Sequence, residues 1–154
     1  MTAHLKKLLL VLSILVLGFG PNANAMEART EAAKVMAIKA AEHIKLKGQK
    51  AAFAAFETKG GEYHDKALYV FVLNLSGSVV SHGADKNLIG KNLLNIKDTT
   101  GKEFVKEFVN TAKTKGVGWV DYVWPHPTTK NPAPKSSYIL QVGKNLLVGV
   151  GAYK

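Results

Sequence analysis

Three strand-like runs fill the C-terminal part of the chain, and they constrain the fold more than any other feature. The runs cover residues 117–124, 136–142 and 146–153, and their β-branched and aromatic residues favour strands. Only the segment Gly143–Asn145 separates the last two runs, which is the length of a hairpin turn. Strands joined this tightly pair antiparallel, so the sequence predicts an antiparallel sheet.

The N-terminal part is predicted to be helical. Residues 27–47 are rich in Ala, Glu and Lys and contain neither Gly nor Pro, a composition that favours a helix. Gly48 interrupts this segment, and residues 49–57 can resume as one or two helical turns. One narrow face of the long helix is expected to pack on the domain. The moderately apolar stripe on that face comprises Ala32, Val35, Met36 and Lys39.

A hairpin and a second helix are predicted between these two parts. Residues 68–75 form a nearly continuous apolar run, and Ser76–Gly77 turn the chain into a strand over residues 79–82. The segment Thr100–Glu103 has capping-box spacing and predicts a helix start, and Gly116 marks the end of that helix. Its apolar face comprises Phe104, Val105, Phe108, Val109 and Ala112. The whole order predicts an α+β domain, with a five-stranded antiparallel sheet and helices on one side.

The first 25 residues contain the three parts of a secretory signal peptide. The basic part comprises His4, Lys6 and Lys7, and the apolar part covers residues 8–17. The segment Ala23–Ala25 is a small-x-small cleavage site. The sequence therefore predicts export.

We accordingly expect a signal peptide over residues 1–25, cleavage before Met26 and a single domain over residues 26–154. The protein would be secreted across the inner membrane and would reside in the periplasm. The alternative is an uncleaved anchor, but the apolar run is shorter than the roughly 20 residues that span a bilayer. No later run is long enough to cross a membrane, so no transmembrane segment is expected after cleavage. The chain contains no Cys, so its fold does not depend on disulfides.

The chain is strongly basic, with a formal net charge of +10 at pH 7. Its lysines are scattered along the sequence, whereas nucleic-acid binding requires a dense basic stripe within a recognisable module. We therefore expect no nucleic-acid partner. The charge favours an anionic ligand, an acidic partner or an anionic membrane surface. The simpler interpretation is a solvated basic surface.

The sequence contains no motif for catalysis or metal binding. It has no G-x-S-x-G elbow, no H-E-x-x-H helix and no glycine loop in the setting that phosphate binding requires. His43, His64 and His126 lack the spacing of metal ligands. We therefore expect neither an enzyme nor a bound metal or cofactor.

Aromatic residues and a lysine near the C-terminus suggest a pocket for a small anion. Side chains alternate along a strand, so Val120, Tyr122 and Trp124 project from the same face. Aromatic rings with polar tips beside a cation suit an organic anion, and Lys135 opens the next strand as such a cation. Tyr138 faces the other way from Lys135 unless the strand is irregular there. The alternative interpretation is a hairpin core with a solvated lysine.

Short segments spread in order over nearly the whole chain resemble the single Cache domain, a PAS-like extracytoplasmic sensor module of bacterial chemoreceptors and sensor kinases. Each segment alone is a weak signal, but their combination is specific. The segments are Leu68–Asn74 with Gly77, Ser81–Gly83, Leu88–Asn92, Lys97–Asp98 with Gly101–Lys102, Gly118–Trp124, Lys135–Tyr138 and Val148–Tyr153.

The resemblance implies a long N-terminal helix on one face of a five-stranded antiparallel sheet and a ligand pocket on the other face. Members of the family typically bind small carboxylates such as acetate, propionate, pyruvate or lactate. By this resemblance, Tyr122 and Trp124 would line the pocket and Lys135 would bind the carboxylate. Tyr138 would donate a hydroxyl hydrogen bond, and His82 would lie at the pocket edge.

The resemblance also implies a role in signal transduction or chemotaxis as a module that binds a small organic acid. Family members usually continue into a transmembrane helix and a signalling domain, whereas this chain ends at Lys154. We therefore expect it to act through a separate partner, a membrane sensor or chemoreceptor. The alternative is an envelope interaction protein with a vestigial pocket, which docks through its basic surface on an envelope protein or an anionic polymer.

Overall fold

The computed structural model describes residues 21–154. The basic and apolar parts of the predicted signal peptide lie outside the described residues. Its last segment, residues 21–25, is the beginning of helix α1 (Pro21–Lys47). The signal peptide and the domain boundary at Met26 therefore stay predictions. Within the described part of the chain, no helix has both the length and the apolar character to cross a membrane.

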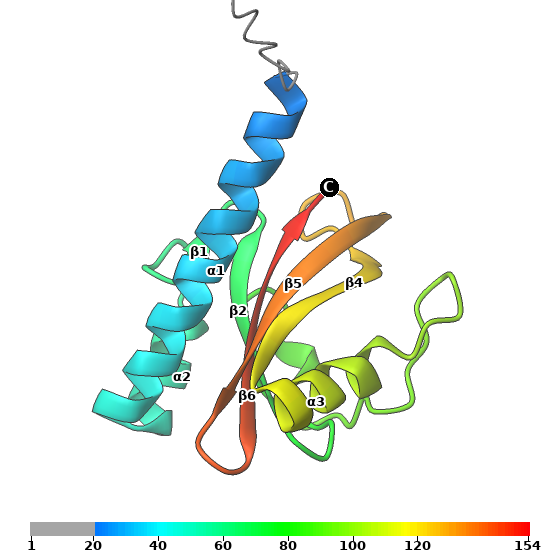
Figure 1. Ribbon diagram of the computed structural model, residues 1–154. Coiled ribbons are helices and arrows are strands. Elements are labelled where there is room, and N and C mark those ends of the chain that lie inside the picture. The colour runs from blue at the N-terminus through cyan, green and yellow to red at the C-terminus, as the bar shows by residue number, and fades with distance from the viewer. Residues whose placement is uncertain (1–20) are drawn as a thin grey trace, which may run out of the picture.

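An antiparallel sheet forms the centre of the fold (Figure 1). Its strands lie in the order β3–β2–β6–β5–β4, and each neighbouring pair is antiparallel. The strands are β2 (Leu68–Asn74), β3 (Val79–His82), β4 (Val117–Pro125), β5 (Pro132–Val142) and β6 (Leu146–Tyr153). A two-residue strand, β1 (His64–Asp65), also pairs with the start of β2. The predicted α+β class and five-stranded antiparallel sheet are confirmed, with β1 as a short addition.

Helices cover both faces of this sheet (Figure 1). Helix α1 and the short α2 (Gln49–Phe56) lie on one face, and α3 (Phe104–Lys115) lies on the other. The prediction that all helices lie on one side is wrong. The sheet carries apolar side chains on both faces, such as buried Val70 and Phe71 in β2, so each face requires a cover.

Helix α1 packs on the sheet through small side chains. Its buried face comprises Ala33, Ala37, Ala40, Ala41 and Ile44. The predicted stripe is wrong, because Val35 is 55% exposed. The alanines allow the helix to lie close to β5 and β6, and this close approach determines which face is buried.

Helix α3 begins later than its predicted capping box. Glu103, at the N-cap position, makes no side-chain cap hydrogen bond. The Thr100 hydroxyl donates instead to Asp98 at 2.6 Å, so Thr100 belongs to the preceding turn. The predicted end of the helix is confirmed: Gly116 has a left-handed φ of 74°, which favours glycine.

Strand β5 begins earlier than predicted and includes two prolines. Pro132 pairs with Pro125 of β4, so Lys135 lies inside the strand rather than at its start. Along β5, pairing with β6 ends where Lys135 meets Tyr153. Pro132 and Pro134 lie beyond that point, where the ladder to β6 does not require their missing N–H groups.

Candidate functional site

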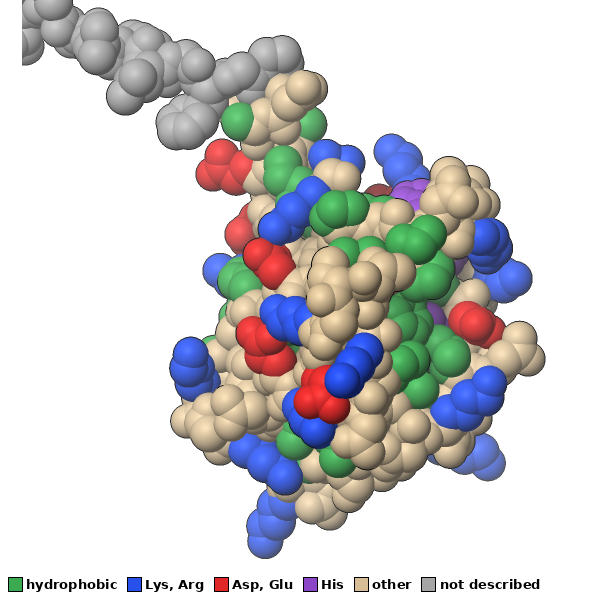
Figure 2. Space-filling view, turned by 90° about the vertical axis from the view of Figure 1, so that its right-hand side faces the viewer, with side chains coloured by type: hydrophobic (Ala, Val, Ile, Leu, Met, Phe, Trp, Pro, Cys, Tyr) green, Lys and Arg blue, Asp and Glu red, His purple; other side chains and the backbone are tan. Residues whose placement is uncertain are grey.

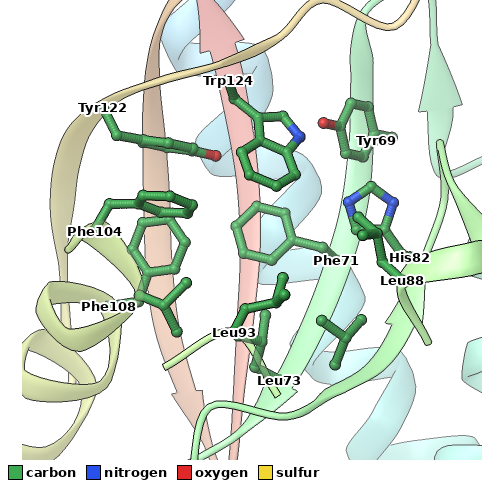
Figure 3. A pocket seen from close by; sticks show the side chains of 12 residues that line it. Tyr69, Phe71, Leu73, His82, Leu88, Leu93, Phe104, Phe108, Tyr122 and Trp124 are labelled. Carbon is green, nitrogen blue, oxygen red and sulfur yellow. The ribbon is translucent and has the colours of Figure 1, made fainter. Parts of the chain in front are cut away.

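A small cavity between the sheet and α3 is the candidate ligand site (Figure 3). Its volume is about 30 Å³. Part of its wall comes from the loop between β3 and α3, which contains the short helix η1 (Lys86–Leu88). The cavity is lined by Tyr69, Phe71, Leu73, Val79, His82, Leu88, Leu93, Phe104, Val105, Phe108, Tyr122 and Trp124.

A larger hollow of about 260 Å³ adjoins the cavity, and we call it the vestibule. It shares Tyr69, His82, Leu88 and Trp124 with the cavity. Its other lining residues are Ala84, Asp85, Pro125, His126, Pro127 and Lys130. The shared side chains therefore lie between the small cavity and the larger vestibule.

The cavity has a polar end and an apolar end. Figure 3 shows the polar tips of Tyr69, Tyr122 and Trp124 gathered at one end. The Tyr122 hydroxyl lies 2.9 Å from Oγ of Ser137, and the Phe104 ring stacks on Tyr122 with 4.6 Å between centroids. The opposite end is formed by Phe71, Phe108, Leu73 and Leu93. Such a cavity suits a small ligand with a polar head and an apolar remainder.

Lys135 lies buried behind the polar end, with 1% of its surface exposed. Its Nζ donates to the Tyr69 hydroxyl at 2.8 Å and lies 4.0 Å from the centroid of the Tyr69 ring. The Tyr153 ring encloses it from another side, 4.7 Å from Nζ. No Asp or Glu within residues 21–154 forms a salt bridge with it. Burial lowers the pKa of Lys135 well below its usual 10.5, because a charged amine loses its hydration there.

Two glycines of β6 provide the space that this cluster occupies. Gly149 and Gly151 lie on the same face of the strand, two positions apart. A Cβ atom at Gly151 would overlap Cε of Lys135, and one at Gly149 would overlap the Phe71 ring. The glycines therefore let the lysine stem and the ring lie against the sheet backbone.

A chain of hydroxyl groups continues from Lys135 towards the hairpin between β4 and β5. The Tyr69 and Tyr153 hydroxyls are 3.3 Å apart, and the Tyr153 hydroxyl donates to the carbonyl of Pro125 at 2.9 Å. Burial raises the pKa of Tyr69 and Tyr122 well above 10 and that of Tyr153 to about 12. These phenols therefore stay protonated at neutral pH and carry no charge that balances Lys135.

His82 lies beside Tyr69, with 5.0 Å between the ring centroids. Its Nδ1 accepts the backbone N–H of Asp85 at 2.9 Å, which places the hydrogen of the neutral ring on Nε2. Burial, and then the charge of Lys135, lowers the pKa of His82 from 6.5 to about 3. The ring is therefore neutral at physiological pH, and its Nε2–H is a donor suited to an anion.

Four of the five predicted site residues lie on the cavity side of the sheet. Tyr122, Trp124 and His82 line the cavity. Lys135 does not line it, because the ring and hydroxyl of Tyr69 lie between the two. Direct contact of these residues with a ligand stays a prediction.

Tyr138 lies on the opposite face of the sheet, outside the cavity. It packs against the core beneath α1, and its ring is 5.1 Å from that of Trp119. Strand β5 pairs without irregularity from Pro132 to Val142, so residues three apart face opposite ways. The irregularity that Tyr138 would need to share a face with Lys135 is absent from β5, so the role predicted for Tyr138 has no geometric basis.

Sequence reasoning missed the side chains that enclose Lys135. The nearly continuous apolar run of β2 hides its alternation, so Tyr69 and Phe71 are indistinguishable from ordinary core residues in the sequence. The available signal is in β6, where Gly149 and Gly151 alternate. Two glycines on one face of a predicted strand indicate that another group approaches the backbone closely.

The site offers hydrogen-bond donors rather than metal ligands. Within residues 21–154, no group of three or more His, Cys, Asp or Glu side chains is arranged to hold a metal ion. The polar end instead presents an amine, phenolic hydroxyls and ring N–H groups, which suit an oxygen-bearing anion.

Two curated signalling proteins are similar to part of the chain. The sensor histidine kinase MctS of Rhizobium johnstonii is 33% identical over 86 residues, which make up 55% of this chain and 18% of that protein. The methyl-accepting chemotaxis protein McpP of Pseudomonas putida is 32% identical over 92 residues, which make up 58% of this chain and 17% of that protein. The similarity thus covers less than a fifth of each relative.

Solved structures of sensor domains have the same fold. A periplasmic sensor domain of a chemotaxis protein is 27% identical, with a TM-score of 0.69 over 88% of this chain and 99% of that one. A methyl-accepting chemotaxis protein from Vibrio parahaemolyticus is 22% identical, with a TM-score of 0.72 over 85% and 92%. A Cache chemosensory domain described for carboxylic acid recognition is also 22% identical, with a TM-score of 0.65 over 86% and 92%.

The family comparison agrees with the fold and with these relatives. Residues 49–154 match the model of the Cache domain, which includes every strand together with α2 and α3. Cache domains are extracytoplasmic signalling modules, and the relatives carry them in chemotaxis proteins and a sensor kinase. The resemblance found in the sequence is therefore confirmed, and the chain belongs to the Cache domain family.

Proposed function

We propose that this protein is an extracytoplasmic sensor module that binds a small organic acid in the cavity, with its carboxylate at the polar end. The observation that carries the proposal is Lys135, a buried amine with no acidic partner among the described residues. Buried charges in proteins are normally paired. A ligand carboxylate supplies the negative charge that the ammonium form of this amine requires, and the two form a charge-assisted hydrogen bond.

Tyr69 connects the buried amine to the cavity. Its hydroxyl accepts a hydrogen bond from Nζ of Lys135, and the Tyr153 hydroxyl donates its hydrogen to the carbonyl of Pro125. The hydrogen of Tyr69 is therefore directed to Tyr153 across 3.3 Å, a long bond for two hydroxyls. A carboxylate is a stronger acceptor, so it can take over this hydrogen or displace the Tyr69 hydroxyl from Nζ.

Neutral donors complete the head-group site. The Tyr122 hydroxyl and the Trp124 indole N–H lie at the polar end of the cavity (Figure 3). His82 is fixed by its bond to Asp85 with the hydrogen on Nε2. These groups add hydrogen bonds to the carboxylate without a second cation, which favours an acid with one charge.

The comparisons support this proposal through the chemistry of one neighbour. A structure with a TM-score of 0.65 is described for carboxylic acid recognition by a Cache chemosensory domain. We further propose that the protein is exported by its predicted signal peptide to the periplasm. It would pass its signal to a membrane sensor or chemoreceptor, because its relatives are parts of such proteins.

A thermal-shift screen against acetate, propionate, pyruvate and lactate tests the proposal. At 100 times its dissociation constant, a ligand stabilises the folded protein by about 2.7 kcal/mol, which raises the melting temperature by several degrees. Lys135→Ala should remove this shift. Lys113→Ala, which removes an exposed lysine of α3, should keep it. A shift that survives Lys135→Ala, or no shift with any small acid, would refute the proposal.

The alternative of docking through a basic surface receives less support. Figure 2 shows Lys and Arg side chains dispersed over the face in view, with acidic side chains between them. Several charged side chains of residues 21–154 are paired, as in Lys102–Glu107 at 2.7 Å and Lys154–Asp121 at 3.0 Å. Paired and dispersed charges create a weaker field for an anionic partner than a concentrated patch.

A further inference from the structure

The surroundings of Lys135 determine whether its amine carries a charge before an acid binds. The side chains around it come from every strand of the main sheet. They are Tyr69 and Phe71 of β2, His82 of β3, Tyr122 of β4, Ser137 of β5 and Tyr153 of β6. None of them carries a negative charge at neutral pH. Asp85, the acidic residue of the vestibule, accepts the N–H of Asn87 with its carboxylate and donates its backbone N–H to His82.

The enclosure therefore favours the neutral form of the amine. The faces of Tyr69 and Tyr153 attract a cation at 4.0 and 4.7 Å. A cation–π contact restores only part of the hydration that an ammonium loses on complete burial. The Tyr69 hydroxyl gives the amine one hydrogen-bond partner, whereas an ammonium has three hydrogens to satisfy.

A carboxylate at the polar end reverses this preference. Its negative charge, placed close to an amine that is itself buried, stabilises the ammonium much more strongly than it would in water. A bound carboxylate thus shifts the amine from its neutral form towards its charged form.

Building on the proposed carboxylate function, we propose that the site takes up one proton from the solvent with each carboxylate it binds. The neutral amine of Lys135 and the free carboxylate combine with this proton to form an ammonium–carboxylate pair. No covalent bond forms besides the new N–H bond, and the composition of the bound species equals that of the undissociated acid.

The consequence is a sensor that responds to acid concentration and to acidity together. Affinity should rise about tenfold for each unit by which the pH falls, between the pKa of Lys135 in the free protein and its pKa in the complex. Release of an organic acid into a weakly buffered compartment raises both quantities. Both changes therefore increase the fraction of the protein that has acid bound.

Isothermal titration calorimetry of the protein with sodium acetate and sodium propionate tests the proposal. Titrations at one pH in phosphate and in Tris, whose protonation enthalpies differ, give the number of protons taken up on binding. At a pH above the pKa of Lys135 in the free protein, we expect this number of protons to be close to one. We also expect the dissociation constant to rise with pH. Binding without proton uptake, with equal affinity at about pH 6 and about pH 8, would overturn the inference and leave the proposed function intact. Absence of binding would overturn both.

Two variants identify the group that gains the proton. Lys135→Arg keeps a charge at every accessible pH, so any binding it retains should proceed without proton uptake. His82→Gln removes the other nearby basic group and one donor to the carboxylate, so it should weaken binding, but each bound carboxylate should still bring one proton. Loss of the uptake in His82→Gln would assign the proton to the histidine and overturn the proposal.

An NMR measurement on the wild-type protein tests the proposal without relying on the folding of a variant. In protein labelled with ¹³C at lysine Cε, the Lys135 signal should report a neutral amine in the free protein and an ammonium after acetate or propionate is added. A Lys135 signal that is already that of an ammonium in the free protein at neutral pH would overturn the proposal.

Discussion

At the scale of single residues, Lys135 is unfavourable for the stability of the free protein and necessary for the proposed function. Its amine is 1% exposed and contacts Tyr69, Phe71 and Tyr153. An apolar side chain of similar length would fit this environment better than a group that must lose its charge or its hydration. Functional residues often carry such a stability cost.

Lys135→Met should therefore stabilise the free protein while it abolishes acid binding. The free energy of unfolding near neutral pH should increase by about 1–4 kcal/mol, measured by chemical denaturation. The fold lowers the pKa of Lys135 from 10.5, so the contribution of Lys135 to the free energy of unfolding falls as the pH drops below 10.5. Lys135→Met should remove this pH dependence. The exposed control Lys113→Met should change stability by less than about 0.5 kcal/mol. A destabilised Lys135→Met that still binds acids would contradict this account.

His82 should contribute to loss of stability in acid. The fold lowers the pKa of His82 from 6.5 to about 3, so its contribution is complete above pH 6.5 and is lost as the pH falls towards 3. The loss should be on the order of 4 kcal/mol, and His82→Gln should remove most of it from denaturation curves measured across this range. The control His64→Gln changes a histidine outside the site and should keep the wild-type acid dependence. Equal pH profiles for wild type and His82→Gln would refute the assignment.

At the scale of secondary-structure elements, the loop before α3 closes part of the free edge of β4. The Asp98 carboxylate accepts the hydroxyl and N–H of Thr100, the N–H of Lys102 and the N–H of Val123. The last of these bonds ties the loop to the outer edge of β4, where an unpaired strand would otherwise be exposed. The same loop leads from Leu93 to Phe104, and both line the cavity.

Asp98→Asn should loosen this loop and weaken acid binding indirectly. The bonds from Thr100, Val123 and Lys102 lower the pKa of Asp98 to about 2, so its contribution is present above pH 3.8 and is lost as the pH falls towards 2. The substitution should cost about 1 kcal/mol, since the group is near the surface, and amide exchange in residues 98–103 should accelerate. The control Asp121→Asn removes a surface ion pair on the same edge and should leave exchange in the loop unchanged. Unaltered exchange in Asp98→Asn would contradict the proposed closure.

The glycines of β6 give a second prediction at this scale. A methyl group at Gly149 would overlap the Phe71 ring and push it into a cavity of about 30 Å³. Gly149→Ala should therefore weaken acid binding about tenfold or more and cost about 1–3 kcal/mol of stability. Phe71→Leu, added to Gly149→Ala, should restore part of both losses, which a double-mutant cycle measures. Strict additivity of the two substitutions would show that the ring and the glycine are not coupled.

Elements with strong local signals could be predicted from the sequence. Strand β6 has the predicted bounds, and α3 ends at the predicted Gly116. The start of β5 could not be predicted, because Pro132 and Pro134 act as strand breakers unless the neighbouring strand has already ended. That condition depends on where pairing between β5 and β6 ends, and the residues around Pro132 and Pro134 do not indicate this position.

The candidate site was only partly predictable for a similar reason. Alternation correctly placed Tyr122 and Trp124 on one face, because it depends on backbone geometry alone. Burial of Lys135 could not be predicted from the sequence, since a lysine side chain is usually solvated. Its environment arises from β2, β5 and β6 together, and only the alternating glycines of β6 indicated that something lies against the sheet.

At the scale of the whole molecule, the sheet separates two hydrophobic cores with different roles. The core beneath α1 contains small and β-branched side chains, and the core beneath α3 contains the aromatic cavity. Contacts also join the two sides around the edge of the sheet. The Ser81 hydroxyl donates to Glu57 at the end of α2 at 3.1 Å, and Glu57 lies 3.7 Å from Lys86 of η1. The cavity wall and the helical layer are therefore in direct contact.

Acid binding should depend only weakly on salt if it takes place inside the second core. Exposed charges are screened within about 10 Å at 0.1 M salt, whereas a buried pair is screened far less. Affinity for acetate or propionate should therefore change by less than about threefold between low and physiological ionic strength, measured by calorimetry. A steep loss of affinity with salt would instead indicate binding through the basic surface.

A crystal structure of the protein with acetate or propionate tests the central claim most directly. We expect the carboxylate at the polar end of the cavity, within hydrogen-bonding distance of Nζ of Lys135 or the hydroxyl of Tyr69, and the carbon atoms of the acid towards Phe71. A carboxylate bound outside the cavity, or a cavity that stays without the acid at saturating concentration, would contradict it.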